Sequence, residues 1–390
     1  MEKRYIFRDI ERDALADGKM AFISGPRQVG KTTLAKGLLL GSQNYFSWDD
    51  DDFRRAWSKS ASDAVAARGP GPIVLDEIHK QTTWKRKLKG LYDTRGGKDL
   101  PIVVTGSARL DFFRRGGDSL LGRYLPYRLH PFSVGERETP PGPNEITVAR
   151  AARFPWHDLK RLGGFPEPLL GGSEAKARRW SRLRLERLIA EDIRDLRAVR
   201  DLQALRVLVD LLPERVGSPL SINNLREDAG VAYATAYEWI GVLEALYHCF
   251  LIRPWAGKLK RTLAAEPKLY LFDPLPIGDE GARSENLVAL HLLKACHYWT
   301  DLAHGVFELR YVRDKERREV DFLVVRDGKP WLMVEAKTTE TEPSRALMHY
   351  RHLLAPEFAV QLVDVDGFER DYSETKVKVV SYDRFLAGLV

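Results

Sequence analysis

The sequence predicts an α/β protein of several domains, the first of which is built on a mostly parallel sheet. Over residues 1–138, short apolar runs bounded by Gly, Pro or charged residues alternate with stretches of helical composition, as in sheets that helices cover on both faces. Residues 175–212 are rich in Leu, Arg, Glu and Ala at helical spacing, and the chain then returns to mixed strands and helices. These changes predict a sheet domain at 1–138, a helical linking region at 139–215, a helix-turn-helix segment at 216–262 and a second α/β domain at 263–390.

Composition indicates a globular protein of a reducing compartment. Of the 390 residues, 44% are hydrophobic and 30% are charged, and the formal net charge is +7. This amount of apolar material excludes disorder as the main state. Cys249 and Cys296 cannot form a disulfide framework, and no segment has the apolar core of a signal peptide or the ~18 apolar residues of a membrane span. We therefore expect a cytoplasmic protein without a membrane partner.

A glycine-rich segment directly follows the first apolar run, Met20–Ser24. Its residues 25–32, Gly-Pro-Arg-Gln-Val-Gly-Lys-Thr, fit the pattern GxxxxGK[ST] and open a helical stretch at 33–40. Backbone N–H groups of such a loop bind phosphate oxygens, Lys31 reaches the β- and γ-phosphates, and the Thr32 hydroxyl ligates Mg²⁺. The sequence therefore predicts a site for ATP and Mg²⁺. Its expected binding residues are Gly25, Pro26, Arg27, Gln28, Val29, Gly30, Lys31, Thr32 and Thr33.

Two acidic residues end the next expected strand, residues 73–75. Asp76 is expected to hold Mg²⁺, and Glu77 to polarise the water that attacks the γ-phosphate. His79 lies just beyond them and is interpreted as a neighbour of the site, not as a ligand. An acidic pair behind a buried strand and a phosphate loop therefore predicts hydrolysis of ATP rather than mere binding.

Two further apolar runs, residues 102–105 and 127–129, complete the expected sheet. The first of them ends in hydroxyl groups. If this strand lies between the two that carry the phosphate loop and the acidic pair, Thr105 or alternatively Ser107 orients the attacking water. We take Thr105 as the expected catalytic residue.

The order of these motifs resembles that of the AAA+ ATPases. Residues 120–123, Leu-Leu-Gly-Arg, precede an expected strand and the segment 130–133, His-Pro-Phe-Ser, which is similar to one prokaryotic branch of that family. Members of this branch join an AAA+ core to a winged helix and a C-terminal domain. The resemblance implies a homo-oligomer, with a hexamer as one form, in which an arginine of a neighbouring subunit neutralises charge on the γ-phosphate. Arg123 is the expected residue, with Arg114 and Arg115 as alternatives.

Residues 216–262 resemble a winged helix-turn-helix. Ser221 caps a first helix, residues 228–231 form a tight turn, and residues 233–247 form the helix in the recognition position. From Glu227 to Ile252 the sequence contains no Lys or Arg, although a helix that reads DNA normally brings cations to the phosphates. Two interpretations stay open: the wing contacts a DNA backbone, or the segment serves packing or oligomerisation.

Basic residues gather in two segments, one before and one after the expected recognition helix. Either segment can bind nucleic-acid phosphates or form a solvated helix face or loop. The first contains Lys176, Arg178, Arg179, Arg182, Arg184 and Arg187, and the second contains Arg253, Lys258, Lys260 and Arg261.

The C-terminal domain carries a D…ExK pattern on two expected strands. Asp321 lies on one, while Glu335 and Lys337 share a face of the next, and Glu285 lies in an upstream helix. The order helix, strand, strand resembles the PD-(D/E)xK nuclease superfamily. This resemblance implies that the carboxylates share Mg²⁺ and that Lys337 neutralises charge on a phosphodiester. The alternative, without a metal site, is a structural ion pair between Glu335 and Lys337 on one strand face.

Two functions from different classes fit these features. The first is an ATPase that binds or remodels DNA, single-stranded or branched, with a nuclease-like C-terminal domain. The second is a nucleotide-gated switch that acts on a protein partner and has no nuclease activity. A small-molecule kinase fits Lys31 but neither Glu77 nor the added domains.

Overall fold

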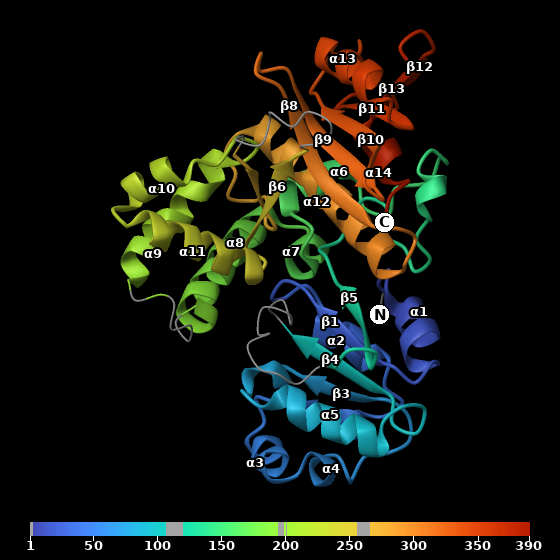
Figure 1. Ribbon diagram of the computed structural model, residues 1–390, viewed down its shortest axis with the longest axis vertical. Coiled ribbons are helices and arrows are strands. Elements are labelled where there is room, and N and C mark those ends of the chain that lie inside the picture. The colour runs from blue at the N-terminus through green and yellow to red at the C-terminus, as the bar shows by residue number, and fades with distance from the viewer. Residues whose placement is uncertain (1–2, 107–119, 194–198, 200, 256–265) are drawn as a thin grey trace. The chain divides into compact units, whose positions relative to one another are not determined.

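The structure is a computed structural model that describes residues 3–106, 120–193, 199, 201–255 and 266–390 (Figure 1). The chain packs as two compact units, each considered by itself. The first comprises the chain up to Pro131 with Arg137–Thr139 and Ala245–Tyr247, and the second comprises Phe132–Glu136, Pro140–Glu244 and His248–Val390. The predicted domain boundaries, that at residue 138 included, stay predictions. No helix among the described residues is long and apolar enough to cross a membrane.

The first unit is an α/β domain with a parallel sheet, which confirms the predicted fold class. In its described part, five strands pair in the order β2-β3-β4-β1-β5, all parallel. The strand β1 has the bounds expected from the sequence, whereas β5 begins three residues earlier than the expected run at 127–129. The strands are β1 Met20–Ser24, β2 Tyr45–Ser47, β3 Ile73–Asp76, β4 Ile102–Gly106 and β5 Tyr124–Arg128.

Buried aromatic and aliphatic side chains fix the helices of this unit on its sheet. Asp50 caps α3 by accepting a hydrogen bond from the N–H of Phe53, and Phe53 and Trp57 then face the core that Phe22 and Leu75 supply. The helix after the phosphate loop starts at the lysine of the motif and ends before the expected residue 40. The helices are α1 Phe7–Asp9, α2 Lys31–Gly37, α3 Asp51–Lys59, α4 Ala61–Ala64 and α5 Trp84–Arg95, with short helical turns at Ile10–Leu15, Ser42–Asn44 and Ile78–Lys80.

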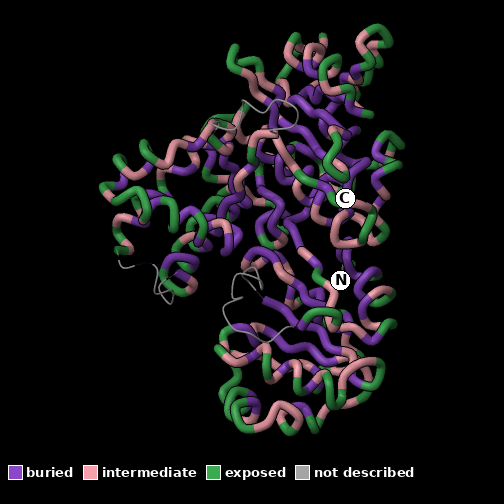
Figure 2. The backbone as a smooth tube through the Cα atoms, viewed as in Figure 1, coloured by how far each residue is buried: buried purple, intermediate pink, exposed green. Residues whose placement is uncertain are grey.

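The second unit contains a mixed sheet of eight strands in its described part. The strands pair in the order β12-β13-β11-β10-β9-β8-β6-β7. The central strands β9, β10 and β11 are mostly buried, whereas β12 has no buried residue; Figure 2 colours the backbone by burial. Pairings of β10 with β11, β11 with β13 and β6 with β8 are parallel, and the others are antiparallel. The strands are β6 Cys249–Pro254, β7 Lys268–Leu271, β8 Phe307–Arg313, β9 Glu319–Arg326, β10 Lys329–Ala336, β11 Phe358–Val363, β12 Glu369–Tyr372 and β13 Val377–Ser381.

The helices of the second unit include the predicted helix-turn-helix order. Helix α10 is followed by α11, which ends two residues before the expected residue 247, and then by the antiparallel pair β6 and β7. Because β6 also pairs with β8, this hairpin is continuous with the C-terminal sheet. A winged helix stays a prediction. The helices are α6 Trp156–Leu162, α7 Pro166–Gly171, α8 Glu174–Arg187, α9 Leu202–Leu211, α10 Ile222–Ala229, α11 Tyr233–Ala245, α12 Glu280–Asp301, α13 Arg345–Leu354 and α14 Tyr382–Leu386, with turns at Pro143–Glu145, Leu188–Ile193 and Leu212–Arg215.

A buried histidine ties α12 to the segment Phe132–Glu136. The Nε2 of His291 accepts a hydrogen bond of 3.0 Å from the backbone N–H of Val134, and Nδ1 therefore carries the proton that it donates to the Leu287 carbonyl, 2.6 Å away. Burial, reinforced by the nearby charge of Lys294, lowers the pKa of His291 to about 4. The folded protein thus requires this imidazole to be neutral.

We expect this requirement to make stability depend on pH. Between pH 6.5 and about 4 the unfolded chain binds a proton at His291 that the folded chain does not bind, so stability present above pH 6.5 is lost as pH falls through this window. The loss for one such group is up to about 1.4 kcal/mol per pH unit. A His291→Gln variant, which does not titrate there, should show a shallower change of the urea unfolding midpoint between pH 7 and pH 4. The exposed His352→Gln variant is the control and should keep the wild-type profile; an unchanged profile in His291→Gln would contradict the assignment.

Candidate functional site

The phosphate loop joins β1 to α2 at the carboxyl end of a central strand. Gly25 has a φ of +156°, and a Cβ atom built on it would lie 2.2 Å from the carbonyl oxygen of Leu129, so no side chain fits at this position. Gly30 immediately precedes α2 with a φ of +99°. The first and last glycines of the motif are therefore demanded by the backbone path itself.

Lys31 is buried and its ammonium group lies within the loop. Its Nζ atom donates hydrogen bonds to the carbonyl oxygens of Gly25 at 2.9 Å and Pro26 at 2.7 Å. Behind the loop, Arg4 donates a hydrogen bond of 2.9 Å to the carbonyl of Val29, whose side chain is fully buried. These contacts hold the loop in shape and keep its cation where a phosphate group would be received.

The other loop residues differ in how far they face solvent. Pro26 is buried, Arg27 and Thr32 are half-buried, and Thr33 is exposed on the first turn of α2. Gln28 has a positive φ of 65°, and its Oε1 atom is buried without a hydrogen-bond partner. Such an unsatisfied buried acceptor is uncommon in folded proteins.

The carboxylate of Asp76 is the centre of the site. It accepts hydrogen bonds from the hydroxyl groups of Thr32 on α2, at 3.0 Å, of Tyr45 on β2, at 2.5 Å, and of Thr105 on β4. Thr32 and Asp76 are the pair expected to hold Mg²⁺, and a hydroxyl next to a carboxylate is a donor set that suits this ion. The residues present therefore fit the predicted metal.

Tyr45 is a member of this site that sequence reasoning missed. It lies on a strand of three residues, too short to stand out as an apolar run. Burial and the hydrogen bond to Asp76 raise its pKa, so the phenol stays protonated and remains a donor. Its proximity to Asp76 results from the parallel register, in which Tyr45 aligns with Val74.

Glu77 leaves the sheet directly after Asp76. Its φ is +56°, an uncommon value for a residue with a side chain, and its backbone N–H donates to the Thr105 carbonyl at 3.1 Å. Its Oε2 atom lies 3.6 Å from Nε2 of the buried His79. The structure thus brings Glu77, Asp76 and Thr105 to one edge of the sheet, while the role of Glu77 toward water stays a prediction.

Arg123 lies at the opposite edge of this sheet. It directly precedes β5, and Met20 at the start of β1 donates its backbone N–H to the Arg123 carbonyl, so β1, roughly 15 Å long, separates Arg123 from the loop. Its guanidinium group binds Asp93 through two hydrogen bonds of 2.7 and 3.1 Å. Arg123 therefore does not serve the nucleotide of its own chain, and a contact in a neighbouring subunit stays a prediction. Arg114, Arg115 and Ser107 lie outside the described residues.

Three of the four predicted C-terminal residues converge where β9 and β10 lie side by side. The Oδ2 atom of Asp321 accepts a hydrogen bond of 2.9 Å from the N–H of Ala336, and Oε1 of the buried Glu335 lies 2.9 Å from Nζ of Lys337. Ser344 at the start of α13 donates to the other Glu335 oxygen at 2.6 Å. Burial, together with the charge of Asp321, raises the pKa of Glu335.

The fourth residue, Glu285 on α12, joins this group through a lysine that sequence reasoning missed. The Nζ atom of Lys268 on β7 lies 3.3 Å from Oε1 of Glu285, 2.5 Å from Glu319 and 3.8 Å from Asp321. Burial and the charge of Asp321 raise the pKa of Glu285. The available signal was a lysine at the start of the otherwise apolar strand Lys-Leu-Tyr-Leu.

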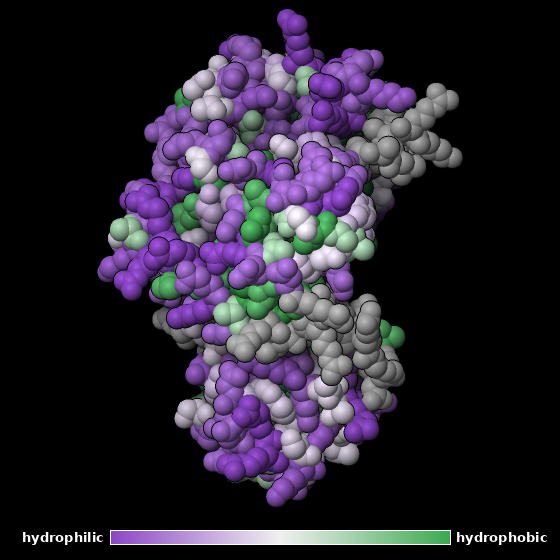
Figure 3. Space-filling model, turned by 90° about the vertical axis from the view of Figure 1, so that its left-hand side faces the viewer, coloured by the Kyte–Doolittle hydropathy of each residue, from purple (hydrophilic) through white to green (hydrophobic). Residues whose placement is uncertain are grey.

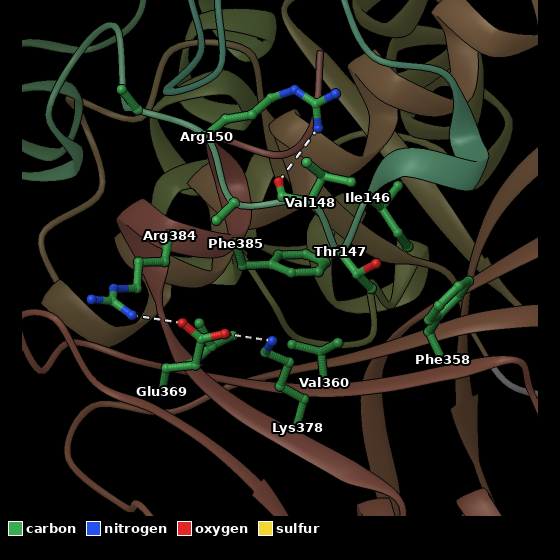
Figure 4. Close-up of a pocket in the computed structure, with 13 residues that line it drawn as sticks. Ile146, Thr147, Val148, Arg150, Phe358, Val360, Glu369, Lys378, Arg384 and Phe385 are labelled. Atoms are coloured by element: carbon green, nitrogen blue, oxygen red, sulfur yellow. Dashed lines mark hydrogen bonds and ion pairs between the residues drawn. The ribbon is translucent and has the colours of Figure 1, made fainter.

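A separate hollow of about 380 Å³ lies over the sheet of the second unit (Figure 4). Its charged side chains are already paired: Glu369 binds Lys378 at 2.5 Å and Arg384 at 2.6 Å. None of the residues predicted from the sequence lines it, so we do not count it as a functional site.

Comparison with known proteins agrees with the nucleotide site. Residues 17–138 match a family model described as an AAA domain, and residues 155–274 and 280–385 match two families described as domains of unknown function (DUF8612 and DUF4143). Uncharacterized proteins of Mycobacterium bovis and Mycobacterium tuberculosis are each 24% identical to this chain over 360 residues, covering 86% of it and 74% of the relative.

Two solved structures are distantly similar to this chain. The Aeropyrum pernix ORC1 protein in complex with DNA is 16% identical with a TM-score of 0.30, covering 70% of this chain and 86% of that one. The Thermotoga maritima RuvB Holliday junction branch migration motor is 15% identical with a TM-score of 0.28, covering 64% of this chain and 86% of that one. With its parallel sheet and its phosphate loop, the part of the chain at residues 17–138 matches the AAA domain family and has the fold of P-loop ATPases.

Proposed function

We propose that this protein hydrolyses ATP with Mg²⁺ and couples hydrolysis to the binding or remodelling of DNA in the cytoplasm. The proposed hydrolysis of ATP rests on one observation. Hydroxyl groups of Thr32 and Thr105 converge on Asp76, beside the loop that holds Lys31. Many kinases that share the loop and the metal lack a carboxylate directly after the metal-binding aspartate, as Glu77 is here.

Each residue has a distinct task in this proposal. Lys31 binds the β- and γ-phosphates, and Thr32 and Asp76 hold Mg²⁺, which when bound stabilises negative charge on the phosphate oxygens. Glu77 accepts a proton from the attacking water. The Thr105 hydroxyl donates its proton to Asp76, and its oxygen retains lone pairs with which it can orient that water.

Basic side chains on α8 support the DNA partner. Lys176, Arg178, Arg179, Arg182 and Arg187 are exposed, and only two of them lie within 4 Å of acids of the helix, Arg178 at 3.5 Å from Glu174 and Arg182 at 3.9 Å from Glu186. Such a row of cations favours phosphate binding with release of counterions. Arg184 is the exception in the predicted cluster, because it is buried over the ring of Phe165 at 4.5 Å. Lys258, Lys260 and Arg261 lie outside the described residues.

A protein partner is the second candidate, and α11 favours it. Tyr233 and Tyr237 are 51% and 63% exposed, and their rings lie nearly parallel with centroids 6.4 Å apart. The helix carries no cation, and Glu238 beside the tyrosines is exposed. Exposed aromatic pairs without basic neighbours are typical of protein interfaces. Figure 3 shows the side on which α9 and α10 lie, and its surface is predominantly hydrophilic with scattered apolar spots.

Assembly is the remaining part of the proposal. Because Arg123 lies a strand length from its own phosphate loop, its proposed contact with the γ-phosphate needs a neighbouring copy, and a hexameric ring is one such homo-oligomer. Cleavage of DNA by Glu285, Asp321, Glu335 and Lys337 stays a prediction of the sequence.

Nucleotide binding is tested most directly at Gly25. A Gly25→Ala variant should bind a fluorescent ATP analogue at least ~10-fold more weakly, because its methyl group would collide with the Leu129 carbonyl and displace the loop. Fluorescence titration measures the affinity. Gly90→Ala on α5 is the matched control, since nothing lies within 4 Å of the added methyl group there. Equal affinity in Gly25→Ala and wild type would remove the loop from the binding site.

Hydrolysis is tested at Glu77. The Glu77→Gln variant should bind ATP as tightly as wild type but turn it over about 100-fold more slowly, because the amide cannot accept the proton of water. Phosphate release in single- and multiple-turnover assays measures this. The exposed Glu11→Gln variant should retain full turnover, and full turnover in Glu77→Gln would show that another group activates the water.

Charge reversal on α8 distinguishes a DNA partner from a protein partner. An Arg178→Glu/Arg182→Glu variant should bind single-stranded, duplex and branched DNA about 10-fold more weakly at low salt and should lose DNA stimulation of ATP turnover. Tyr237→Ala should change neither quantity. Turnover that is indifferent to every DNA, in wild type and variant alike, would favour the protein partner.

A further inference from the structure

We infer that Lys268 is a built-in cation that takes the place of a divalent metal ion in the C-terminal carboxylate group, so this domain does not cleave phosphodiesters by a metal-dependent route. The inference concerns the second unit alone and does not depend on the proposed hydrolysis of ATP.

The ammonium group of Lys268 lies among three carboxylates that come from two different elements. Glu285 belongs to α12, and Glu319 and Asp321 belong to β9, yet all three have an oxygen within 4 Å of Nζ. The side chain of Lys268 is 2% exposed, so water does not screen these contacts. A lysine is rarely buried to this degree unless carboxylates compensate its charge.

The backbone fixes the position of this ammonium group. Lys268 pairs with Ile252 across β6 and β7 and forms an isolated bridge with Pro219. The ring of Tyr311 lies 5.6 Å from Nζ, on the distance scale of a cation–π contact. The lysine is therefore anchored from two sides of its strand and is not a surface side chain that has folded inward.

The backbone at Gly217 also lies close to the Glu285 carboxylate. Gly217 has a φ of +75°, and a Cβ atom built there would lie 3.1–3.3 Å from the Glu285 carboxylate. On the other side the hydroxyl of Tyr270 donates to Glu285 Oε1 at 2.7 Å. The glycine thus permits an approach of backbone to carboxylate that leaves little room for a hydrated ion.

Further carboxylate oxygens of the group are engaged as well. Both oxygens of Glu335 have partners, Lys337 and Ser344, and Oδ2 of Asp321 accepts the N–H of Ala336. A Mg²⁺ ion needs near-octahedral oxygen ligands at 2.0–2.1 Å, and it would place two positive charges beside the buried ammonium. The residues as arranged do not fit a divalent cation.

Removal of the ammonium group should therefore create a metal site that wild type lacks. Mn²⁺ is titrated into the full chain without nucleotide, and free Mn²⁺ is followed by electron paramagnetic resonance. We expect Lys268→Met to bind about one Mn²⁺ per chain more than wild type, and Lys268→Met/Asp321→Asn to lose that ion again. Lys268→Arg, which keeps the cation, should behave as wild type does.

A comparison of wild type with Asp321→Asn keeps the inference testable if Lys268→Met does not fold. We expect the two to bind equal amounts of Mn²⁺ and neither to nick supercoiled DNA in Mn²⁺. Mn²⁺ bound by wild type and lost in Asp321→Asn, or nicking with that dependence, would overturn the inference. A folded Lys268→Met variant that binds no additional Mn²⁺ would overturn it too.

Discussion

The hydrogen bonds that Asp76 accepts are the interaction on which the nucleotide site depends. Thr32, Tyr45 and Thr105 come from three elements that the chain separates by up to 73 residues, and the parallel register places them around one carboxylate. Their proximity requires that β2, β3 and β4 lie in this order with their carboxyl ends aligned. The order and register of the strands therefore position the residues around Asp76, and the phosphate loop adds the remaining groups of the site.

The negative charges of the Asp76 and Asp321 carboxylates have partners of different kinds. Around Asp76 the hydrogen-bond partners are neutral hydroxyl groups, which orient the carboxylate and leave its charge in place. Around Asp321 the partner is the ammonium group of Lys268, which cancels charge at the same point. A carboxylate that keeps its charge attracts a divalent cation, whereas one that has a fixed cation beside it does not. Likeness in residue type therefore does not imply likeness in chemistry between the two centres.

The sequence predicted the first sheet and its site well because the motifs are local. A glycine loop, its lysine and a carboxylate at the end of an apolar run are read from a few adjacent residues, and β1, β3 and β4 lie where their apolar runs predict. Tyr45, Lys268 and the pairing of Arg123 with Asp93 depend on contacts between residues distant in the chain, which no local pattern encodes. The burial of Arg184 was unpredictable for the same reason, because tertiary packing places this one arginine of the basic helix against Phe165.

If the C-terminal carboxylates hold an internal cation, the chemistry of this chain is confined to the phosphate loop, and the second unit acts through its surfaces. Two surfaces of different character are available there: the cations of α8, which suit a polyanion at low salt, and the tyrosine pair of α11, which suits an apolar or aromatic partner. They lie on separate helices, so binding of a nucleic acid to one does not require the other. The nature of the partner therefore depends on which of these two surfaces is used, and not on the nuclease-like order of the C-terminal strands.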